Sequence, residues 1–227
     1  MVALPILPFF GSIPDNLSIY RRLSFYFNGP GINLFDLQIY VQMIYASIDI
    51  ETTGLDPKIH QILEIAIVIE DTSVKKPIEE LPTFTTLIRH DNYTWAPEAY
   101  KMNRGLFEEI LLAGKSVPRI YSDSFSGSIE ESINRFLIAS ADGPIPIAGK
   151  NYAGFDGPFL KRSFPIFGSR RFSHRSIDPS ILFTDWKNDK TPPSLSECLK
   201  RANLPDTVTH RALDDARQVI QLLRTQY

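Results

Sequence analysis

Asp49 and Glu51 are two acidic residues that alternate with apolar residues at the end of the run 44–51, just before a Thr-Thr-Gly turn. The period of two over this run predicts a β-strand with one half-buried, apolar face. Both carboxylates then project from the opposite face of a rigid strand. Carboxylates that are this close raise each other's pKa and lower stability unless a cation lies between them. Taken alone, the pair is most simply a solvated strand end, so other segments must supply further acids before it indicates chemistry.

A third acid, Asp156, follows a short apolar run at 144–149 and a glycine-bearing loop, and it precedes Pro158. Proline is favoured in the first turn of a helix, so this order predicts a strand, a loop and then a helix that begins near Asp156. Taken alone, Asp156 is most simply a helix N-cap whose side chain accepts free backbone N–H groups.

The last candidate residues lie at the head of an amphipathic helix predicted over 212–224. At about 100° per residue, its apolar residues form one buried stripe, Asp215 lies at the border of that stripe, and Asp214 faces solvent. Asp215 can therefore reach a site at the edge of the core. His210 can meet the same site only if it lies in the loop before the helix and folds back. Taken alone, a histidine in this place is a surface residue.

The elements that must position these residues are strands first and helices later. After 44–51, apolar runs at 61–70 and 83–89 predict two more strands in an antiparallel meander, with the acid-bearing strand at the centre of the sheet. Further strands are predicted at 144–149 and 176–178. Helical patterns occur at 96–103, 106–112, 128–137, 194–204 and 212–224. This order predicts an α/β fold, with a mixed sheet covered by helices.

The length of 227 residues fits one domain. Residues 1–42 are apolar and broken by proline and glycine, without the basic start and unbroken apolar core of a signal peptide. No apolar run approaches the roughly 18 residues that span a bilayer, so we expect no membrane partner. We expect 1–42 to be a loosely docked or poorly structured extension and 43–227 to be the functional domain. The alternative is that translation begins at Met43.

Charge and cysteine content narrow the class of protein. The net charge of −2 and pI near 6.1 carry no overall basic signature of a nucleic-acid binder, although metal-binding acids would offset local basic patches. The single Cys198 excludes an intramolecular disulfide and a cysteine-based zinc cluster, and it fits a reducing, cytoplasmic setting.

The acidic segments together resemble a known family. Their order along the chain is Asp49-x-Glu51-Thr52-Thr53-Gly54, then Asn151-x-x-x-Phe155-Asp156, then His210 with Asp215 five residues later. This order resembles the motif set of the DEDDh 3′–5′ exonucleases. These exonucleases are DnaQ-like and oligoribonuclease-like members of the ribonuclease H-like superfamily. The resemblance covers the chain from about Met43 to the C-terminus. It implies a five-stranded mixed sheet whose first three strands are antiparallel.

The resemblance also implies a site. Two divalent cations, Mg²⁺ or Mn²⁺, would be held by Asp49, Glu51, Asp156 and Asp215, with His210 as the general base. The turn after Glu51 would place Thr52 and Leu55 at the 3′ end of the substrate, and Asn151 is a further expected substrate contact. The implied reaction releases nucleoside 5′-monophosphates from the 3′ end of single-stranded DNA or RNA. The competing interpretation is a non-catalytic nucleic-acid-binding module that has kept the fold.

Two further expectations concern partners. No polymerase-binding tail follows the last predicted helix, which argues against a dedicated proofreading subunit, and the sequence leaves monomer and homodimer open. Basic residues gather at 150–175 and at Arg211, interleaved with Phe159, Phe164, Phe167 and Phe172. Phosphate contacts combined with base stacking hold single strands without sequence readout, so this segment predicts a nucleic-acid patch. The simpler interpretation is a charged loop over core aromatics.

Overall fold

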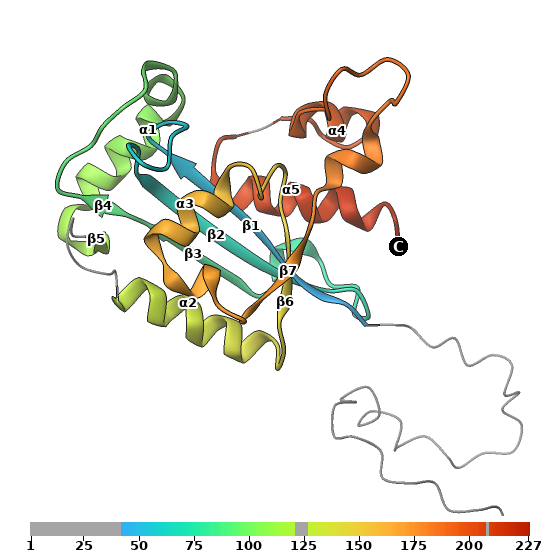
Figure 1. Ribbon diagram of the computed structural model, residues 1–227, viewed down its shortest axis with the longest axis horizontal. Helices are drawn as coiled ribbons and strands as arrows, with labels where there is room; N and C mark the ends of the chain where they lie inside the picture. The colour runs from blue at the N-terminus through green and yellow to red at the C-terminus, as the bar shows by residue number, and fades with distance from the viewer. Residues whose placement is uncertain (1–41, 121–126, 208) are drawn as a thin grey trace, which may run out of the picture. The chain divides into compact units, whose positions relative to one another are not determined.

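The computed structural model describes residues 42–120, 127–207 and 209–227, so the expected extension lies outside the described residues except for Gln42. One five-stranded sheet has the order β3-β2-β1-β6-β7 (Figure 1). Its strands are β1 (Ile44–Thr52), β2 (Ile62–Asp71), β3 (Thr83–Leu87), β6 (Ile145–Ala148) and β7 (Phe172–Ile177). The acid-bearing strand β1 is central, as the sequence predicts.

The sheet is mixed. β1, β2 and β3 are antiparallel neighbours, whereas β6 and β7 run parallel to β1. The short connection 53–61 returns the chain antiparallel, and β6 enters parallel only after a helical crossover. The β1–β2 register places Glu51 directly opposite Glu64. The predicted meander and mixed sheet are confirmed. β4 (Arg89–His90) and β5 (Arg119–Ile120) form a separate two-stranded parallel sheet.

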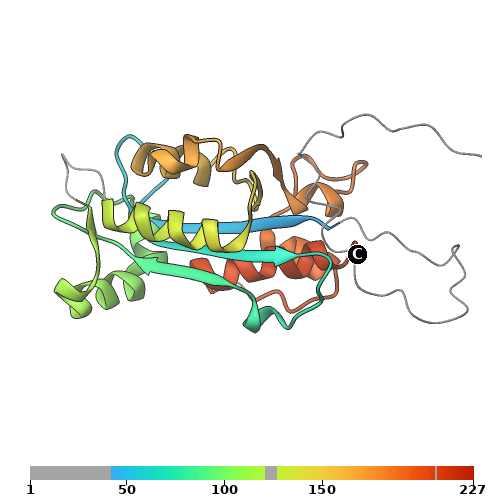
Figure 2. The same ribbon diagram turned by 90° about the horizontal axis from the view of Figure 1, so that it is seen from below.

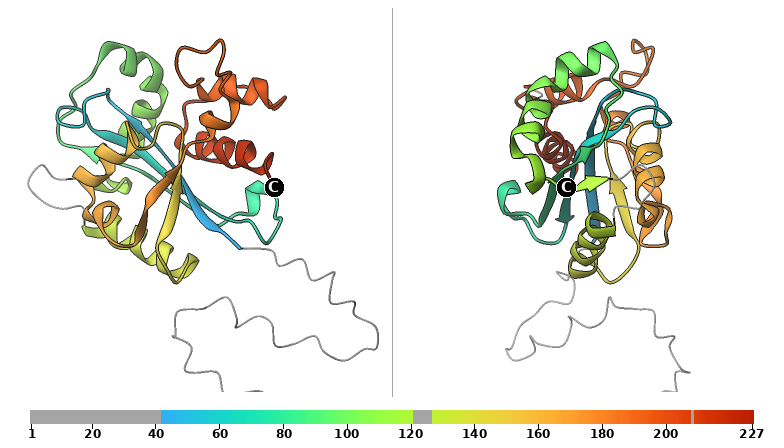
Figure 3. Two further views of the ribbon diagram at one scale, coloured as in Figure 1. Left: turned by 45° about the vertical axis from the view of Figure 1, so that its right-hand side comes forward. Right: turned by 90° about the vertical axis from the view of Figure 1, so that its left-hand side faces the viewer.

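Helices cover both faces of the sheet, which stands between them in Figures 2 and 3. They are α1 (Pro97–Ala113), α2 (Gly127–Ser140), α3 (Asp156–Ser163), α4 (Leu195–Arg201) and α5 (Ala212–Arg224). Short 3₁₀ turns are η3 (Ile78–Glu80), η4 (Gly114–Ser116), η5 (Pro165–Gly168) and η6 (Pro179–Phe183). α2 and α3 share a core with Ile48 and Ile50 of β1, while α5 shares one with Ala66 and Val68 of β2. Within the described ranges, no helix combines the length and apolar character needed to cross a membrane.

The prediction that β1 has only one half-buried face is wrong. Tyr45 and Ser47 lie on the face opposite the isoleucines, yet they are 1% and 0% exposed because α5 covers them. Ala212 and Ala216 lie in the same core as Tyr45, and such small side chains let a helix approach the strand closely. The Ser47 hydroxyl is satisfied there, donating to the carbonyl of Ala216 at 2.7 Å. The alternating polar residues of β1 therefore do not mark a solvent-exposed face of the strand.

The two helical patterns at 96–103 and 106–112 form one helix, α1, with a kink at Asn103 (φ −100°, ψ 15°). The Asn103 side chain is buried, and its amide donates to the carbonyl of Thr52 at 3.0 Å. The kink thus coincides with the contact that fixes α1 to the end of β1.

Two buried glutamates of β2 hold the two ends of α5. Glu64 accepts hydrogen bonds from the Arg211 guanidinium at 3.0 and 3.2 Å and from the backbone N–H of Ala212 at 3.0 Å. Glu70, 1% exposed, pairs with Arg224 at 2.7 Å. Charge-assisted bonds of this kind are stronger than neutral ones, so they fix the position of α5 along the strand.

Substitution Arg224→Met should destabilise the fold by about 3 kcal/mol, because it leaves Glu70 buried without its cation. The measurement is urea unfolding near neutral pH. The control is Arg135→Met on the exposed side of α2, where we expect a change of about 0.5 kcal/mol or less. Equal effects of the two substitutions would contradict the buried pairing.

Candidate active site

The carboxyl end of β1 brings the first two acids to the α5 face of the sheet. Glu51 is 8% exposed, and Asp49 is partly buried two residues before it. The charge on Asp49 interacts with Glu51, Asp156 and Asp215, which places the predicted acids around one point.

Asp156 is the first residue of α3 and not its N-cap, which is Phe155. The side chain of Asp156 is 3% exposed and accepts a hydrogen bond from the backbone N–H of Ile50 at 3.2 Å. The simple N-cap interpretation is therefore wrong. The bond instead ties the start of α3 to β1, between the two acids of that strand.

Asp215 and Asp214 point in different directions, as the helical geometry predicts. Asp215 is 7% exposed, whereas the Asp214 carboxylate accepts from the Thr209 hydroxyl at 2.8 Å, back toward the preceding loop. His210 lies in that loop with φ of 53°, in the left-handed region that non-glycine residues rarely adopt. This turn lets the chain fold back just before α5.

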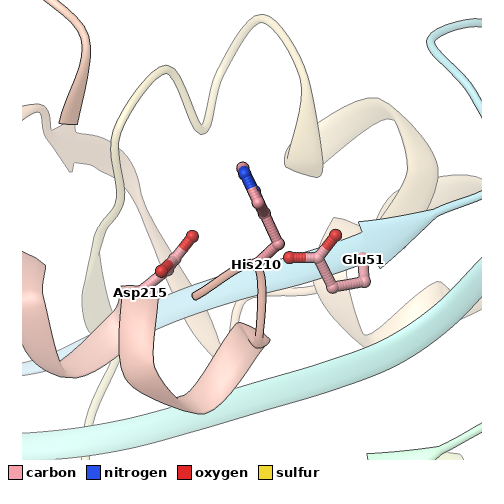
Figure 4. Close-up of side chains that lie close together, drawn as sticks. All are labelled: Glu51, His210 and Asp215. Atoms are coloured by element: carbon pink, nitrogen blue, oxygen red, sulfur yellow. The ribbon is translucent and has the colours of Figure 1, made fainter. Parts of the chain in front are cut away.

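Glu51, His210 and Asp215 meet in the structure (Figure 4). One oxygen of each carboxylate and one ring nitrogen of His210 all lie within 4.8 Å of one another. The two carboxylates are buried and the imidazole is exposed, so the histidine forms the open side of the group.

The surroundings of the clustered carboxyl groups disfavour their charged forms. Burial raises the pKa of Glu51 to about 7, the charges of Asp215 and Glu64 add to this, and a hydrogen bond from Asn103 opposes it. Burial also raises the pKa of Asp156 to about 7, opposed by bonds from backbone N–H groups, and that of Asp215 to about 7. The pKa of Asp49 is raised by burial and then by its acidic neighbours.

The donor set fits hard divalent cations. Carboxylate oxygens are the ligands that Mg²⁺ and Mn²⁺ prefer, and a cation would stabilise the charged forms that burial disfavours here. Among the described residues, Oδ1 of Asp215 is buried without a hydrogen-bond partner. A buried acceptor without a donor is costly, which is consistent with a ligand atom awaiting a cation.

The turn after Glu51 is rigid, and its tip is exposed. The Thr52 hydroxyl donates to the carbonyl of Gly54 at 2.7 Å, and Leu55 is 79% exposed. The His60 ring packs so closely on Gly54 that a Cβ there would lie 2.5 Å from it, so any larger residue would require the ring to move. Leu55 is thus an exposed apolar residue on the turn that follows Glu51.

Asn151 is placed on the loop between β6 and α3, away from the contacts just described. It is exposed and has a φ of 57°, and its backbone N–H donates to Asp178 at 3.0 Å. This bond shapes the loop, and among the described residues no hydrogen bond joins Asn151 to the clustered acids.

Two residues near the acids were missed from the sequence. Glu64 was assigned only to a strand, although a lone charge within a β-branched run signals a buried partner. Asn103 was treated as part of a short helix, yet with Leu106 and Ile110 it makes an apolar stripe at helical spacing, on which a polar residue is notable. Glu64 anchors the loop of His210 through Arg211, and Asn103 contacts the end of β1.

The interpretation of the four interleaved phenylalanines as stacking platforms is wrong. All four are buried; they are Phe159, Phe164, Phe167 and Phe172. Three of the basic residues are also committed to protein partners: Arg162 to the carbonyl of Pro57, Arg171 to that of Ala141, and Arg211 to glutamates. The core-aromatic interpretation holds here.

Comparison with known proteins agrees with this geometry. The sequence profile of a family described as Exonuclease matches residues 46–118, from within β1 to just before β5. The chain is 30% identical over 183 residues to an oligoribonuclease of Haemophilus influenzae, covering 78% of this chain and 88% of that protein. It is 31% identical over 191 residues to an oligoribonuclease of Photobacterium profundum, with 78% and 90% covered. A probable oligoribonuclease of Caenorhabditis elegans is 28% identical over 181 residues, with 78% and 83% covered. The chain therefore belongs to the DnaQ-like 3′–5′ exonucleases, in their oligoribonuclease-like branch.

Proposed function

We propose that this exonuclease hydrolyses short single-stranded RNA from the 3′ end and releases nucleoside 5′-monophosphates. The observation that carries the proposal is the meeting of Glu51, His210 and Asp215 within 4.8 Å, beside Asp49 and Asp156. The choice of RNA rests on the relatives, which are named oligoribonucleases.

The metal ligands in this proposal are Asp49, Glu51, Asp156 and Asp215, which would together hold two Mg²⁺ or Mn²⁺ ions. When bound, such ions activate the attacking water and stabilise the leaving 3′ oxygen. The protein's part is to hold four carboxylates on three rigid elements, so that the ligands are in place before substrate arrives.

His210 is the proposed general base that takes the proton from the water. An imidazole nitrogen can accept a proton from water, and His210 lies on the open side of the cluster. The neighbouring Arg211 is bonded to Glu64 and lies 3.2 Å from Glu109, so the backbone that carries His210 is fixed on one side.

The substrate end rests on the turn after Glu51. Leu55 offers an exposed apolar surface for the terminal base, and the Thr52 carbonyl is held by the Asn103 side chain. Asn151 stays a proposed substrate contact on the loop before α3.

The first test separates two adjacent acids. Labelled single-stranded RNA and DNA are incubated with Mg²⁺, with Mn²⁺ or with EDTA, and we expect stepwise 3′ shortening of RNA that EDTA abolishes. Asp215→Asn should lose nearly all activity, while the matched Asp214→Asn should keep most of it, because only Asp215 faces the cluster.

Two results would reject this assignment. Activity that survives Asp49→Ala would exclude the four-carboxylate mechanism. Binding of RNA without cleavage under all metal conditions would favour the non-catalytic module instead.

The raised pKa values predict how pH affects the metal-free protein. Carboxyls with a pKa of about 7 when folded, and about 4 when unfolded, bind more protons in the folded state at intermediate pH. Raising the pH from about 4 through about 7 therefore destabilises the metal-free fold. In EDTA, we expect a lower Tm at about pH 8 than at about pH 5.5, measured by thermal melting.

A bound divalent cation should offset this loss of stability at the higher pH, where the carboxylates are charged. Mn²⁺ should raise the Tm more at about pH 8 than at about pH 5.5, because its ligands must be deprotonated. Asp49→Asn should shrink both the pH effect and the Mn²⁺ effect, whereas Asp214→Asn should leave both in place. An equal Mn²⁺ effect at the two pH values would contradict the proposed ligands.

A further inference from the structure

A cavity of about 690 Å³ lies between β6, β7, α3 and η5. This volume falls in the range of small-ligand sites, about 300–1,000 Å³. The residues of the acidic cluster do not line it: its wall is formed by β7, by the loop after β6 and by one side of α3. The cavity is therefore a second concave site beside the candidate active site.

A buried hydroxyl without a partner borders this cavity. Tyr152 lines it and is 6% exposed, and its hydroxyl oxygen has no hydrogen-bond partner among the described residues. The hydroxyl end of the ring lies toward Gly157, another lining residue: a Cβ on Gly157 would be 3.6 Å from Cζ of Tyr152. A buried hydroxyl that makes no hydrogen bond costs free energy, so this one indicates an acceptor that comes from a ligand.

The charges around the cavity are all of one sign. Lys161, Arg170 and His174 line it, and no acidic residue does. Lys161 and Arg170 are exposed, and within the described ranges neither forms an ion pair, whereas Arg162 and Arg171 donate to backbone carbonyls. Free cations on a concave rim attract an anion, with phosphate the anion most suited to several such donors.

The interior of the cavity is partly apolar. Phe167 and Phe172 line it and are largely buried, so they make part of the wall apolar but are not stacking platforms. Ser169, Ser173 and Ser176 add hydroxyls along one side. An apolar wall with a basic rim and a few hydroxyls matches a ligand that has a base, a sugar and a phosphate.

We propose that this cavity binds one nucleotide unit, with its phosphate on Lys161 and Arg170 and an oxygen accepting from the Tyr152 hydroxyl. The site is separate from the proposed metal cluster but is joined to it through the chain. The loop residue Tyr152 accepts a hydrogen bond from the backbone N–H of Gly157 at 2.8 Å, one residue after Asp156. A ligand that fixes Tyr152 thus also steadies the start of α3.

The test is binding of AMP to the full chain in EDTA, by titration calorimetry. Without divalent cations the acidic cluster repels a phosphate, so binding under these conditions reports the cavity and is independent of nuclease activity. We expect AMP to bind, adenosine and inorganic phosphate to bind more weakly, and added salt to weaken the binding.

Variants locate the ligand. Lys161→Gln together with Arg170→Gln should weaken AMP binding about tenfold, and Tyr152→Phe, which keeps the ring, about fivefold. Lys200→Gln on the exposed side of α4 is the matched control and should bind as the wild type does. No AMP binding by the wild type in EDTA, or equal binding by all variants, would overturn the proposal; melting curves confirm that each variant is folded.

The nucleotide unit has two sources, a free mononucleotide and part of a longer strand, and kinetics distinguishes them. If the strand enters the cavity, the Lys161→Gln and Arg170→Gln pair raises KM for a longer RNA and not for a dinucleotide. If only a free mononucleotide enters, the double variant keeps the wild-type KM for both RNAs. Added AMP then changes its rate less than that of the wild type, because only product inhibition at the active site is left. Failure of the proposed nuclease activity would leave the binding result in EDTA intact.

Discussion

Crowding of carboxylates at the end of β1 is the constraint on which the rest of the structure depends. Asp49, Glu51, Asp156 and Asp215 are brought together from β1, α3 and α5, although burial raises the pKa of each and the charges of neighbouring acids raise those of Asp49 and Glu51 further. Such a cluster persists only if the elements that carry it are held by other interactions. A fifth acid, Glu64, lies opposite Glu51 and is neutralised by Arg211.

The sheet supplies the opposing interactions. β1 is central and buried on both faces, so neither of its acids can move away from the site by shifting the strand. α5 is held at one end by Glu64 and at the other by Glu70, and between them Ser47 bonds to Ala216. α3 is tied to β1 through Asp156 itself. The same carboxylate is thus both a structural acceptor and a proposed metal ligand, which leaves its other oxygen for chemistry.

Most of the fold followed from periodicity. The alternation in 44–51, the β-branched run of β2 and the amphipathic pattern of α5 are long and regular, and the structure confirms all three. Helical geometry also separated Asp215 from Asp214, because 100° per residue is a property of any α-helix.

The parts that sequence reasoning missed depend on partners far away in the chain. Burial of Tyr45 and Ser47 requires α5, and the burial of Phe159 and Phe164 depends on the sheet beneath them. From the sequence alone, Arg211 is a cation without a known partner, because its partner Glu64 lies on β2, far away in the chain. Asn103 looked like an ordinary helical residue because its acceptor, the carbonyl of Thr52, lies in another element.

The way α5 docks has a consequence for synthesis in the cell. Its contacts with β1 and β2 join residues 169 and 147 positions apart in sequence. During synthesis, the strand with Asp49 and Glu51 is made long before the helix that carries Asp215. The candidate site therefore forms only once α5 has been made and has docked on β1 and β2.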